Sequence, residues 1–383
     1  MPPFSTGRLS ARLERTRKAV SSLGLGGLVV SHVPNVFYLS NLSASSAFLV
    51  VTASRLYLLT DFRYSAAVES LLASPSSPPD TTFVRVEGSY EEALAALLRS
   101  IAPGESMGFE AASMTVRQHR WLTSRLDTAS GPAVALVPTD GVVERLRAVK
   151  DDDELAVMRE AGTRLSEVAA DVLRDVVRKG RSEREMAADV DTRLRAAGFE
   201  RNAFDTIVAT GPTSALPHAH PGARRAEDGD LVLVDFGGVF EGYCVDLTRT
   251  TVIGQPSPEV RRMYRAVADA QDAAMAAVRE GVGADVVDGA AREALARYGL
   301  AEAFGHSTGH GLGLEVHEEP RVGRRRADGA EPWCLAAGMV VTIEPGAYVT
   351  GLGGVRLEDD VIVTGTGASS ITDVPRDPRL LDG

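Results

Sequence analysis

The sequence predicts two successive domains, an α/β domain over residues 1–138 and an α+β domain over residues 143–383. Three observations support this division. The chain has 383 residues, of which 44% are hydrophobic, and this is enough for two hydrophobic cores. Up to about residue 138, strand-length apolar runs alternate with helical stretches, as in an α/β layer. Beyond residue 143 the order becomes helix, helix and strands, and that order occurs twice.

The first domain is predicted to open with a helix over residues 8–24, because Leu9, Leu13 and Val20 recur at helical spacing before Gly24. Three strand-length runs rich in β-branched residues follow, GLVVS, SAFLVVT and RLYLLT. The remaining expected elements are helices at 64–73, 90–101 and 116–125, a Pro/Ser loop at 74–82, and strands at FVRVEG, GESMGFE and PAVALVP.

The second domain is predicted to begin with a long amphipathic helix that ends at Gly180. Ser182 and Glu185 form a capping box for the next helix, which runs to residue 197. The second half repeats this order, which suggests an internal duplication. Its expected elements are helices at 257–281 and 285–297 and strands at 339–343 and 355–363.

Residues 231–250, LVLVDFGGVFEGYCVDLTRT, are predicted to form a two-stranded hairpin whose glycines supply the turn. Asp235 and Asp246 interrupt its two apolar strands. On paired strands the two carboxylates would share one face, where like charges repel. A buried pair of this kind requires a shared proton, an arginine or a metal ion.

The composition argues against several classes of partner. The formal net charge is −11 and the arginines are scattered, which disfavours nucleic acid and anionic membranes. Two cysteines are too few for a disulfide framework, and no apolar run reaches the length of a membrane span. With no signal-peptide pattern at the N-terminus, the expected location is the cytoplasm.

Histidines gather in the second domain in two clusters, ALPHAHPG at 215–222 and FGHSTGHGLGLEVHEEP at 304–320. Two later acids, Glu344 in VVTIEPGAY and Glu358 in GVRLEDDVIV, also interrupt apolar runs. Four such carboxylates and a histidine are sufficient ligands for two divalent metal ions.

These motifs resemble those of the pita-bread metallopeptidases, the superfamily of methionine aminopeptidase, aminopeptidase P and prolidase. The resemblance covers residues 145–365 and implies a pita-bread fold for the α+β domain. It also implies a site with two metal ions. Asp235 would bind one ion through both oxygens, Asp246 and Glu358 would bridge, and His310 and Glu344 would complete the other position.

The resemblance also implies roles for residues around the metals. Glu344 would act as the proton shuttle, and His218 and His317 would hold the substrate and stabilise the oxyanion. His306 matches a position at which the proline-specific members have a histidine. Arg356 lies two residues before Glu358 and therefore on the same strand face, where we expect it to bind the carboxylate of the substrate.

The α/β domain resembles the creatinase-like N-terminal domain of the proline-specific branch. The implied activity is metal-dependent hydrolysis of Xaa-Pro bonds in di- or oligopeptides, with Xaa-Pro dipeptidase (prolidase) as the first choice. The alternatives are aminopeptidase P, a proline-specific carboxypeptidase and a non-catalytic binding module. Mn²⁺ is the first metal to test, followed by Co²⁺, Zn²⁺ and Fe²⁺. The branch also implies a homodimer whose partner N-terminal domain closes the active site, through a segment near residues 37–49.

Overall fold

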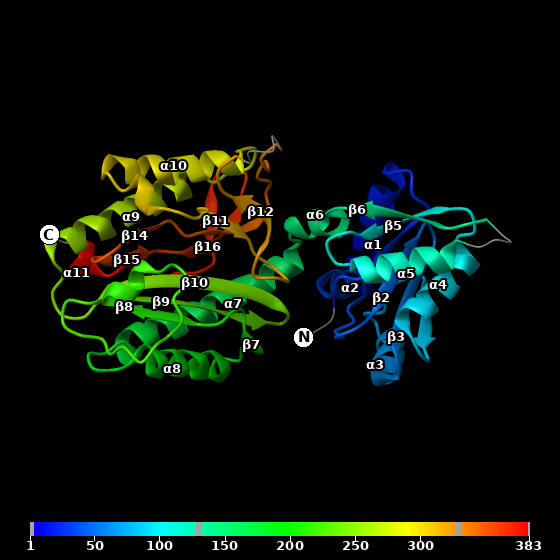
Figure 1. Cartoon of the computed structure of the whole chain (residues 1–383), viewed down its shortest axis with the longest axis horizontal. Helices are drawn as coiled ribbons and strands as arrows, with labels where there is room; N and C mark the ends of the chain where they lie inside the picture. The colour runs from blue at the N-terminus through cyan, green and yellow to red at the C-terminus, as the bar shows by residue number, and fades with distance from the viewer. Residues whose placement is uncertain (1–3, 128–131, 326–330, 382–383) are drawn as a thin grey trace. The chain divides into compact units, whose positions relative to one another are not determined.

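The computed structural model describes residues 4–127, 132–325 and 331–381. The chain divides into two compact units, Met1–Arg147 and Ala148–Gly383, each drawn in Figure 1. The division falls within helix α6 (Val142–Ala148), slightly beyond the stretch 138–143 at which the sequence predicts the boundary. Among the described residues, no helix combines the length and the apolar character needed to cross a membrane.

A mixed six-stranded sheet forms the centre of the first unit, in the order β4-β3-β2-β1-β5-β6. Strands β1 and β2 pair antiparallel, whereas β1, β5 and β6 run parallel. Val29, Val50 and Leu59 from three strands are buried together with Leu94 and Leu98 of α4. The elements of this unit are α1 (Thr6–Ser22), β1 (Gly27–Val30), α2 (Val33–Ser40), β2 (Phe48–Thr52), β3 (Leu56–Asp61), α3 (Phe62–Leu72), β4 (Thr81–Val86), α4 (Tyr90–Ile101), β5 (Ser106–Glu110), α5 (Val116–Leu126), β6 (Ala135–Thr139) and α6.

In the second unit, strands lie between two pairs of helices. Figure 1 shows α9 and α10 on one side of these strands and α7 and α8 on the other. The sheets have the orders β10-β9-β7, with β8 also on β9, β12-β11-β13-β16-β17, and β14-β15. The elements are α7 (Asp152–Asp171), α8 (Glu183–Ala196), β7 (Arg201–Asn202), β8 (Ile207–Thr210), β9 (Leu231–Phe240), β10 (Tyr243–Val252), α9 (Pro258–Ala277), α10 (Ala284–Arg297), β11 (Gly309–Gly311), β12 (Glu318–Val322), β13 (Val340–Ile343), β14 (Gly346–Val349), β15 (Gly353–Arg356), β16 (Asp359–Val363), β17 (Ala368–Ser370) and α11 (Pro378–Leu381).

The long helix predicted at the start of the second domain is two helices, α6 and α7. Asp151 separates them because its side chain accepts hydrogen bonds from the backbone N–H groups of Asp153 and Glu154, while Glu154 bonds back to Asp151. This capping box starts a new helix instead of continuing the old one. The predicted box of Ser182 and Glu185 is present at the start of α8.

The predicted hairpin is present as β9 and β10, but its turn is shorter than expected. Only Glu241 and Gly242, at φ 47° and 81°, lie in the turn, and both positive angles are typical of a two-residue hairpin loop. Gly237 and Gly238 continue the strand. A Cβ on Gly238 would lie 2.3 Å from the ring of Phe199, and a Cβ on Gly237 would clash with the neighbouring strand, so close packing explains both glycines.

Candidate metal centre

The hairpin places its two aspartates on one face. Asp235 pairs with Thr248 and Asp246 pairs with Gly237, so the two carboxylates lie diagonally across the ladder. Both residues are buried. The backbone N–H of Asp246 donates to Asp360 Oδ2 at 2.9 Å, and Asp235 accepts a hydrogen bond from Arg356. The β9–β10 ladder therefore presents two acids to the interior of the second unit.

Three further ligand-type side chains come from the other strands. His310 lies in β11, Glu344 directly follows β13, and Glu358 stands between β15 and β16. Thr248 Oγ1 donates to Glu358 Oε2 at 2.6 Å, which orients that carboxylate from the hairpin. His310 Nε2 lies 3.5 Å from Glu344 Oε1. Segments from three parts of the sequence therefore meet at one point.

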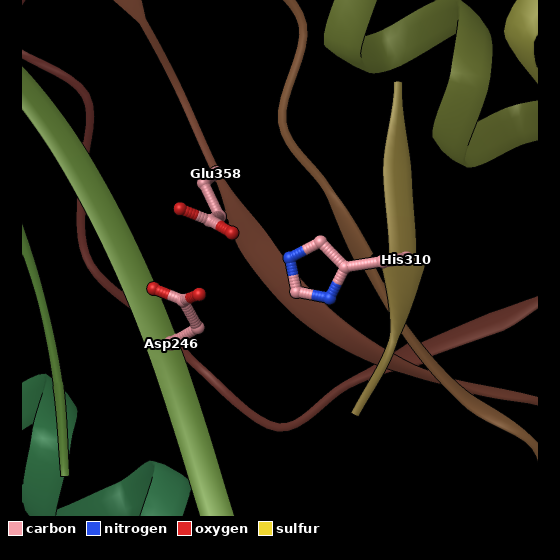
Figure 2. Close-up of side chains that lie close together, drawn as sticks. All are labelled: Asp246, His310 and Glu358. Atoms are coloured by element: carbon pink, nitrogen blue, oxygen red, sulfur yellow. The ribbon is translucent and has the colours of Figure 1, made fainter. Parts of the chain in front are cut away.

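Asp246, His310 and Glu358 form a cluster that could hold a metal ion. One ligand atom from each lies within 4.8 Å of the others, and Figure 2 shows the three side chains converging from different segments of the chain. The Nδ1 atom of His310 lies 3.0 Å from the carbonyl oxygen of Gly311. Because a carbonyl can only accept, Nδ1 carries the proton and Nε2 keeps a free lone pair for a cation.

The buried oxygens of this centre fit a cation. Among the described residues, Asp235 Oδ1, Asp246 Oδ1 and Glu358 Oε1 are buried without a hydrogen-bond partner. Burial of an unpaired carboxylate oxygen is costly, and three convergent oxygens with one imidazole nitrogen are donors that a divalent ion accepts. Asp360, which accepts the backbone N–H of Asp246 through Oδ2, also has a buried oxygen, Oδ1, without a hydrogen-bond partner among the described residues.

The protonation of the centre follows from its burial. Burial, followed by the charges of Glu358 and Asp235, raises the pKa of Asp246 well above its usual range. Burial and the neighbouring Glu344 raise the pKa of Glu358 in the same way. Burial also raises the pKa of Glu344 to about 7 and lowers the pKa of His310 to about 4. The contact between His310 and Glu344 therefore involves a neutral imidazole at neutral pH.

The other predicted histidines lie around this cluster. The rings of His310 and His317 meet edge to face with centroids 4.4 Å apart. His218 is exposed. Burial, followed by the charge of Arg356, lowers the pKa of His306 to about 4, and burial, followed by the proximity of His218, lowers the pKa of His317. His306 Nδ1 lies 2.8 Å from the carbonyl oxygen of Ser307 and therefore carries the proton, so Nε2 accepts a hydrogen bond from the hydroxyl of Tyr348 at 2.9 Å. The histidines of both sequence clusters therefore surround one region of the second unit.

Arg356 is buried beside the metal centre, and its side chain makes hydrogen bonds to four protein residues. Its Nε donates to Thr248 Oγ1, its Nη1 to the carbonyl of Pro217 and the hydroxyl of Tyr348, and its Nη2 to Asp235. These contacts engage most of the five N–H groups of a guanidinium, and the residue is buried. In this structure Arg356 contacts Asp235, and its expected contact with a substrate carboxylate stays a prediction.

Comparison with protein families decides the classification of the chain. Residues 156–365 match the model of metallopeptidase family M24, and residues 12–149 match the creatinase/prolidase N-terminal domain. The chain belongs to family M24. The prediction of a creatinase-like domain followed by a pita-bread metallopeptidase domain is confirmed.

Individual relatives of this M24 peptidase match over most of their length. The Xaa-Pro dipeptidase of Pyrococcus horikoshii is 32% identical, over 95% of this chain and 98% of that protein. The solved structure of an Xaa-Pro dipeptidase from Bacillus anthracis has a TM-score of 0.88 at 32% identity, covering 96% of this chain and 99% of that one. An X-Pro aminopeptidase from Thermotoga maritima has a TM-score of 0.81 at 30% identity, with coverages of 94% and 99%.

Membership of family M24 implies the use of divalent metal, for which the cluster of Asp246, His310 and Glu358 is the candidate site. Sequence reasoning missed two residues of the M24 domain beside this site, Tyr348 and Asp360. The sequence did mark Asp360 as a candidate, since it is the third consecutive acid of LEDDVIV and stands in an apolar run. Tyr348 had none, because a tyrosine in a strand is ordinarily a packing residue.

Proposed function

We propose that this M24 peptidase hydrolyses the bond before proline in Xaa-Pro dipeptides and that it requires divalent metal. The observation that carries the proposal is the nearly end-to-end match to proteins named Xaa-Pro dipeptidase in a chain that retains the buried acids and His310. The contact of Arg356 with the carboxylate of a dipeptide is itself still a prediction. The dipeptide specificity therefore rests on the relatives.

We assign Asp235, Asp246, His310, Glu344 and Glu358 as the residues that hold two metal ions. Divalent ions at this position supply Lewis acidity, which activates water and polarises a peptide carbonyl. Mn²⁺ is the metal we propose first, since carboxylate-rich sites suit it. The unpaired buried oxygens of three of these acids support the assignment.

Glu344 has the properties of a proton carrier in this proposal. Its Oε1 atom lies 3.5 Å from His310 Nε2 within the cluster, where its carboxylate can take a proton and pass it on. His317, beside His310 and partly exposed, can donate a hydrogen bond to the carbonyl oxygen of the substrate. His218 and His306 are proposed to contact the substrate. None of these steps requires Arg356 to leave Asp235.

The test is a product analysis with purified protein. We would incubate an Xaa-Pro dipeptide, an Xaa-Pro-Yaa tripeptide and a longer Yaa-Xaa-Pro peptide with Mn²⁺, and with Co²⁺, Zn²⁺ and Fe²⁺ in parallel. We expect cleavage of the dipeptide and little cleavage of the other two. Cleavage of none of them by the metal-loaded protein would refute the proposal in favour of a binding module.

Aminopeptidase P activity is the second candidate, supported by the likeness to the Thermotoga maritima X-Pro aminopeptidase. Rapid release of the first residue from Xaa-Pro-Yaa, at a rate comparable with that of the dipeptide, would favour this activity. Release of proline from the C-terminus of Yaa-Xaa-Pro would instead indicate a carboxypeptidase variant.

We further propose that the protein works as a homodimer in the cytoplasm. The cytoplasm is a reducing compartment, and Cys244 and Cys334 are both free thiols, as expected there. Light scattering coupled to gel filtration tests the dimer. A chain that is monomeric and fully active at nanomolar concentration would contradict it.

A further inference from the structure

A lysine is buried at the start of the second unit. Lys150 lies between α6 and α7, and its side chain is only 1% exposed. Its backbone N–H donates to the carbonyl of Gly338 at 2.9 Å. A Cβ on Gly338 would lie 3.0 Å from the carbonyl oxygen of Lys150, so the two backbones are closely packed. Lys150 is therefore held at a defined position by its own main chain.

The ammonium group of Lys150 faces a buried carboxylate. Lys150 Nζ lies 3.4 Å from Glu318 Oε2, and the Glu318 side chain is 6% exposed. Glu318 Oε1 accepts the backbone N–H of Glu315 at 2.9 Å. A Cβ on Gly313 would lie 2.8 Å from Glu318 Oε2. The carboxylate of Glu318 therefore fills the inside of the loop over residues 312–317, and Gly313 leaves the space for it.

This loop connects His310 with His317. It leaves β11 after Gly311 and returns at Glu318, and these two residues pair with each other in the sheet. Gly313 also accepts the backbone N–H of Cys244, which ties the loop to the strand that carries Asp246. The distance of 4.4 Å between the His310 and His317 rings therefore depends on how this loop is closed.

A buried ion pair is an inefficient way to stabilise a fold. Removing two charges from water costs about as much as their attraction returns, and apolar side chains of the same size are often as good. The best-supported use of such a pair is to enforce one arrangement among several. For this loop, the competing arrangements are those in which residues 312–317 close differently and His317 moves away from His310.

We propose that the Lys150–Glu318 ion pair is a positioning device that sets His317 against His310. This inference rests on the proposed role of His317 as a substrate contact. Lys150 and Glu318 touch neither the substrate nor the metal in this proposal. They act through the loop that Glu318 closes.

The first experiment compares Lys150→Met, Glu318→Gln, the double variant and Lys150→Arg by kcat, KM, metal content and melting temperature. Each single variant removes one member of the buried ion pair, so the melting temperature falls. The double variant removes both charges and recovers the melting temperature. We expect kcat to stay about 10- to 100-fold below wild type in the double variant, with metal content unchanged, because a displaced His317 costs rate. Lys150→Arg should keep most of the activity.

An exposed ion pair of the same unit provides the matched control. Lys179 and Asp228 are 62% and 66% exposed, and Lys179→Met with Asp228→Asn should change neither kcat nor melting temperature. The proposal is overturned if kcat per metal-loaded molecule of the Lys150→Met/Glu318→Gln variant equals that of wild type. In that case the pair serves stability alone.

A second experiment identifies His317 as the residue through which the pair acts. Glu318→Gln should lower kcat in the wild-type background and have less than about a twofold further effect in His317→Ala, because coupled residues are not additive. Equal losses in both backgrounds would overturn the proposal while leaving the role of His317 intact. If His317→Ala itself keeps wild-type kcat, both the role of His317 and the positioning proposal fail.

Discussion

Asp246 leaves β10 with its carboxylate directed at His310 and Glu358, and its own backbone N–H is held by Asp360. We predict that Asp246→Asn abolishes hydrolysis and weakens metal retention, because a neutral amide cannot bridge two cations as a carboxylate does. Metal analysis and dipeptide hydrolysis check this. Asp205→Asn, at an exposed position of the same unit, is the control and should behave as wild type. Full activity with normal metal content in Asp246→Asn would contradict the assignment.

The two neighbouring histidines should respond differently to removal. We predict that His310→Ala loses metal, since its Nε2 is the free nitrogen that faces Glu358 and Asp246. His317→Ala should keep its metal and lose on the order of a hundredfold in kcat, the usual cost of one preorganised donor. Metal content and kcat measured on the same preparations separate the two. Equal metal loss in both variants would show that the division of roles is wrong.

Arg356 illustrates what sequence reasoning can and cannot reach at the scale of a residue. Strand alternation correctly placed its side chain on the face of Glu358, because side chains two residues apart share a face. Three of its partners, Pro217, Asp235 and Thr248, are distant in sequence. No local pattern contains that information, so the sequence did not predict these contacts, and the role of Arg356 as a reader of the substrate carboxylate stays a prediction.

The structure leads to a changed prediction for Arg356→Lys. A lysine keeps the charge beside Asp235 but cannot reach Tyr348, Thr248 and the Pro217 carbonyl together. We expect the free energy of unfolding to fall by about 1–3 kcal/mol, the cost of buried groups left unbonded. The ratio of dipeptide to tripeptide hydrolysis should remain unchanged. A selective rise in KM for Xaa-Pro dipeptides would instead support the prediction that Arg356 binds the carboxylate of the substrate.

At the scale of elements, helix α10 supports the segment that carries His306 and leads into β11, the strand of His310. Asp288 is buried and accepts from the backbone N–H of Thr308 at 3.1 Å and from its hydroxyl at 2.8 Å. Arg292, one turn later, pairs with Asp288 and donates to the carbonyl of His306 at 2.6 Å. The two side chains thus fix the backbone immediately before β11.

We predict that Asp288→Ala lowers the free energy of unfolding by about 3 kcal/mol, because it leaves Arg292 without its buried partner. Metal affinity should fall as well, since His310 follows the released segment by two residues. Asp288→Asn keeps an acceptor for Thr308 and should be milder. Chemical denaturation and metal titration are the measurements, with Glu293→Ala on the exposed side of α10 as the control. Unchanged metal affinity in Asp288→Ala would show that α10 does not position His310.

The elements themselves were largely predictable, because their signals are local. The capping box of Ser182 and Glu185 and the paired strands around Asp235 and Asp246 occur where spacing and turn residues indicate them. The prediction was wrong where packing decides. Gly237 and Gly238 looked like a turn, yet they lie in a strand because the ring of Phe199 and a neighbouring carbonyl occupy the space of their side chains.

At the scale of the whole molecule, the sequence predicted two domains but could not show which apolar residues are free to reach another chain. In the segment 37–49, proposed to extend to a partner, Tyr38, Leu39, Phe48 and Leu49 are buried in the core of the first unit. The exposed residues there are polar, Ser43 and Ser45. Apolar composition alone does not distinguish a core segment from an interface.

The buried acids of the metal centre also lead to a prediction about the stability of the metal-free protein. The folded-state pKa values of Asp246, Glu344 and Glu358 lie above those of the unfolded chain, with Glu344 at about 7. The folded form therefore binds protons more tightly, and this contribution to stability is lost as the pH rises through the raised values. His306 and His310, whose pKa values are lowered to about 4, act in the opposite direction, but only below about pH 6.5.

Between about pH 6.5 and pH 8 the carboxylates therefore control the stability of the metal-free second unit. We predict that the melting temperature of the chelator-treated protein falls as the pH rises through this window, because acids with raised pKa values ionise beside one another once the metal is removed. Added Mn²⁺ should raise the melting temperature most at pH 8, since metal binds the ionised carboxylates and competes with protons. Differential scanning calorimetry at several pH values, with and without Mn²⁺, tests both statements. A metal-free melting temperature that rises with pH over the same window would mean that these acids are not held together in the folded protein, and a Mn²⁺ effect independent of pH would place the metal elsewhere.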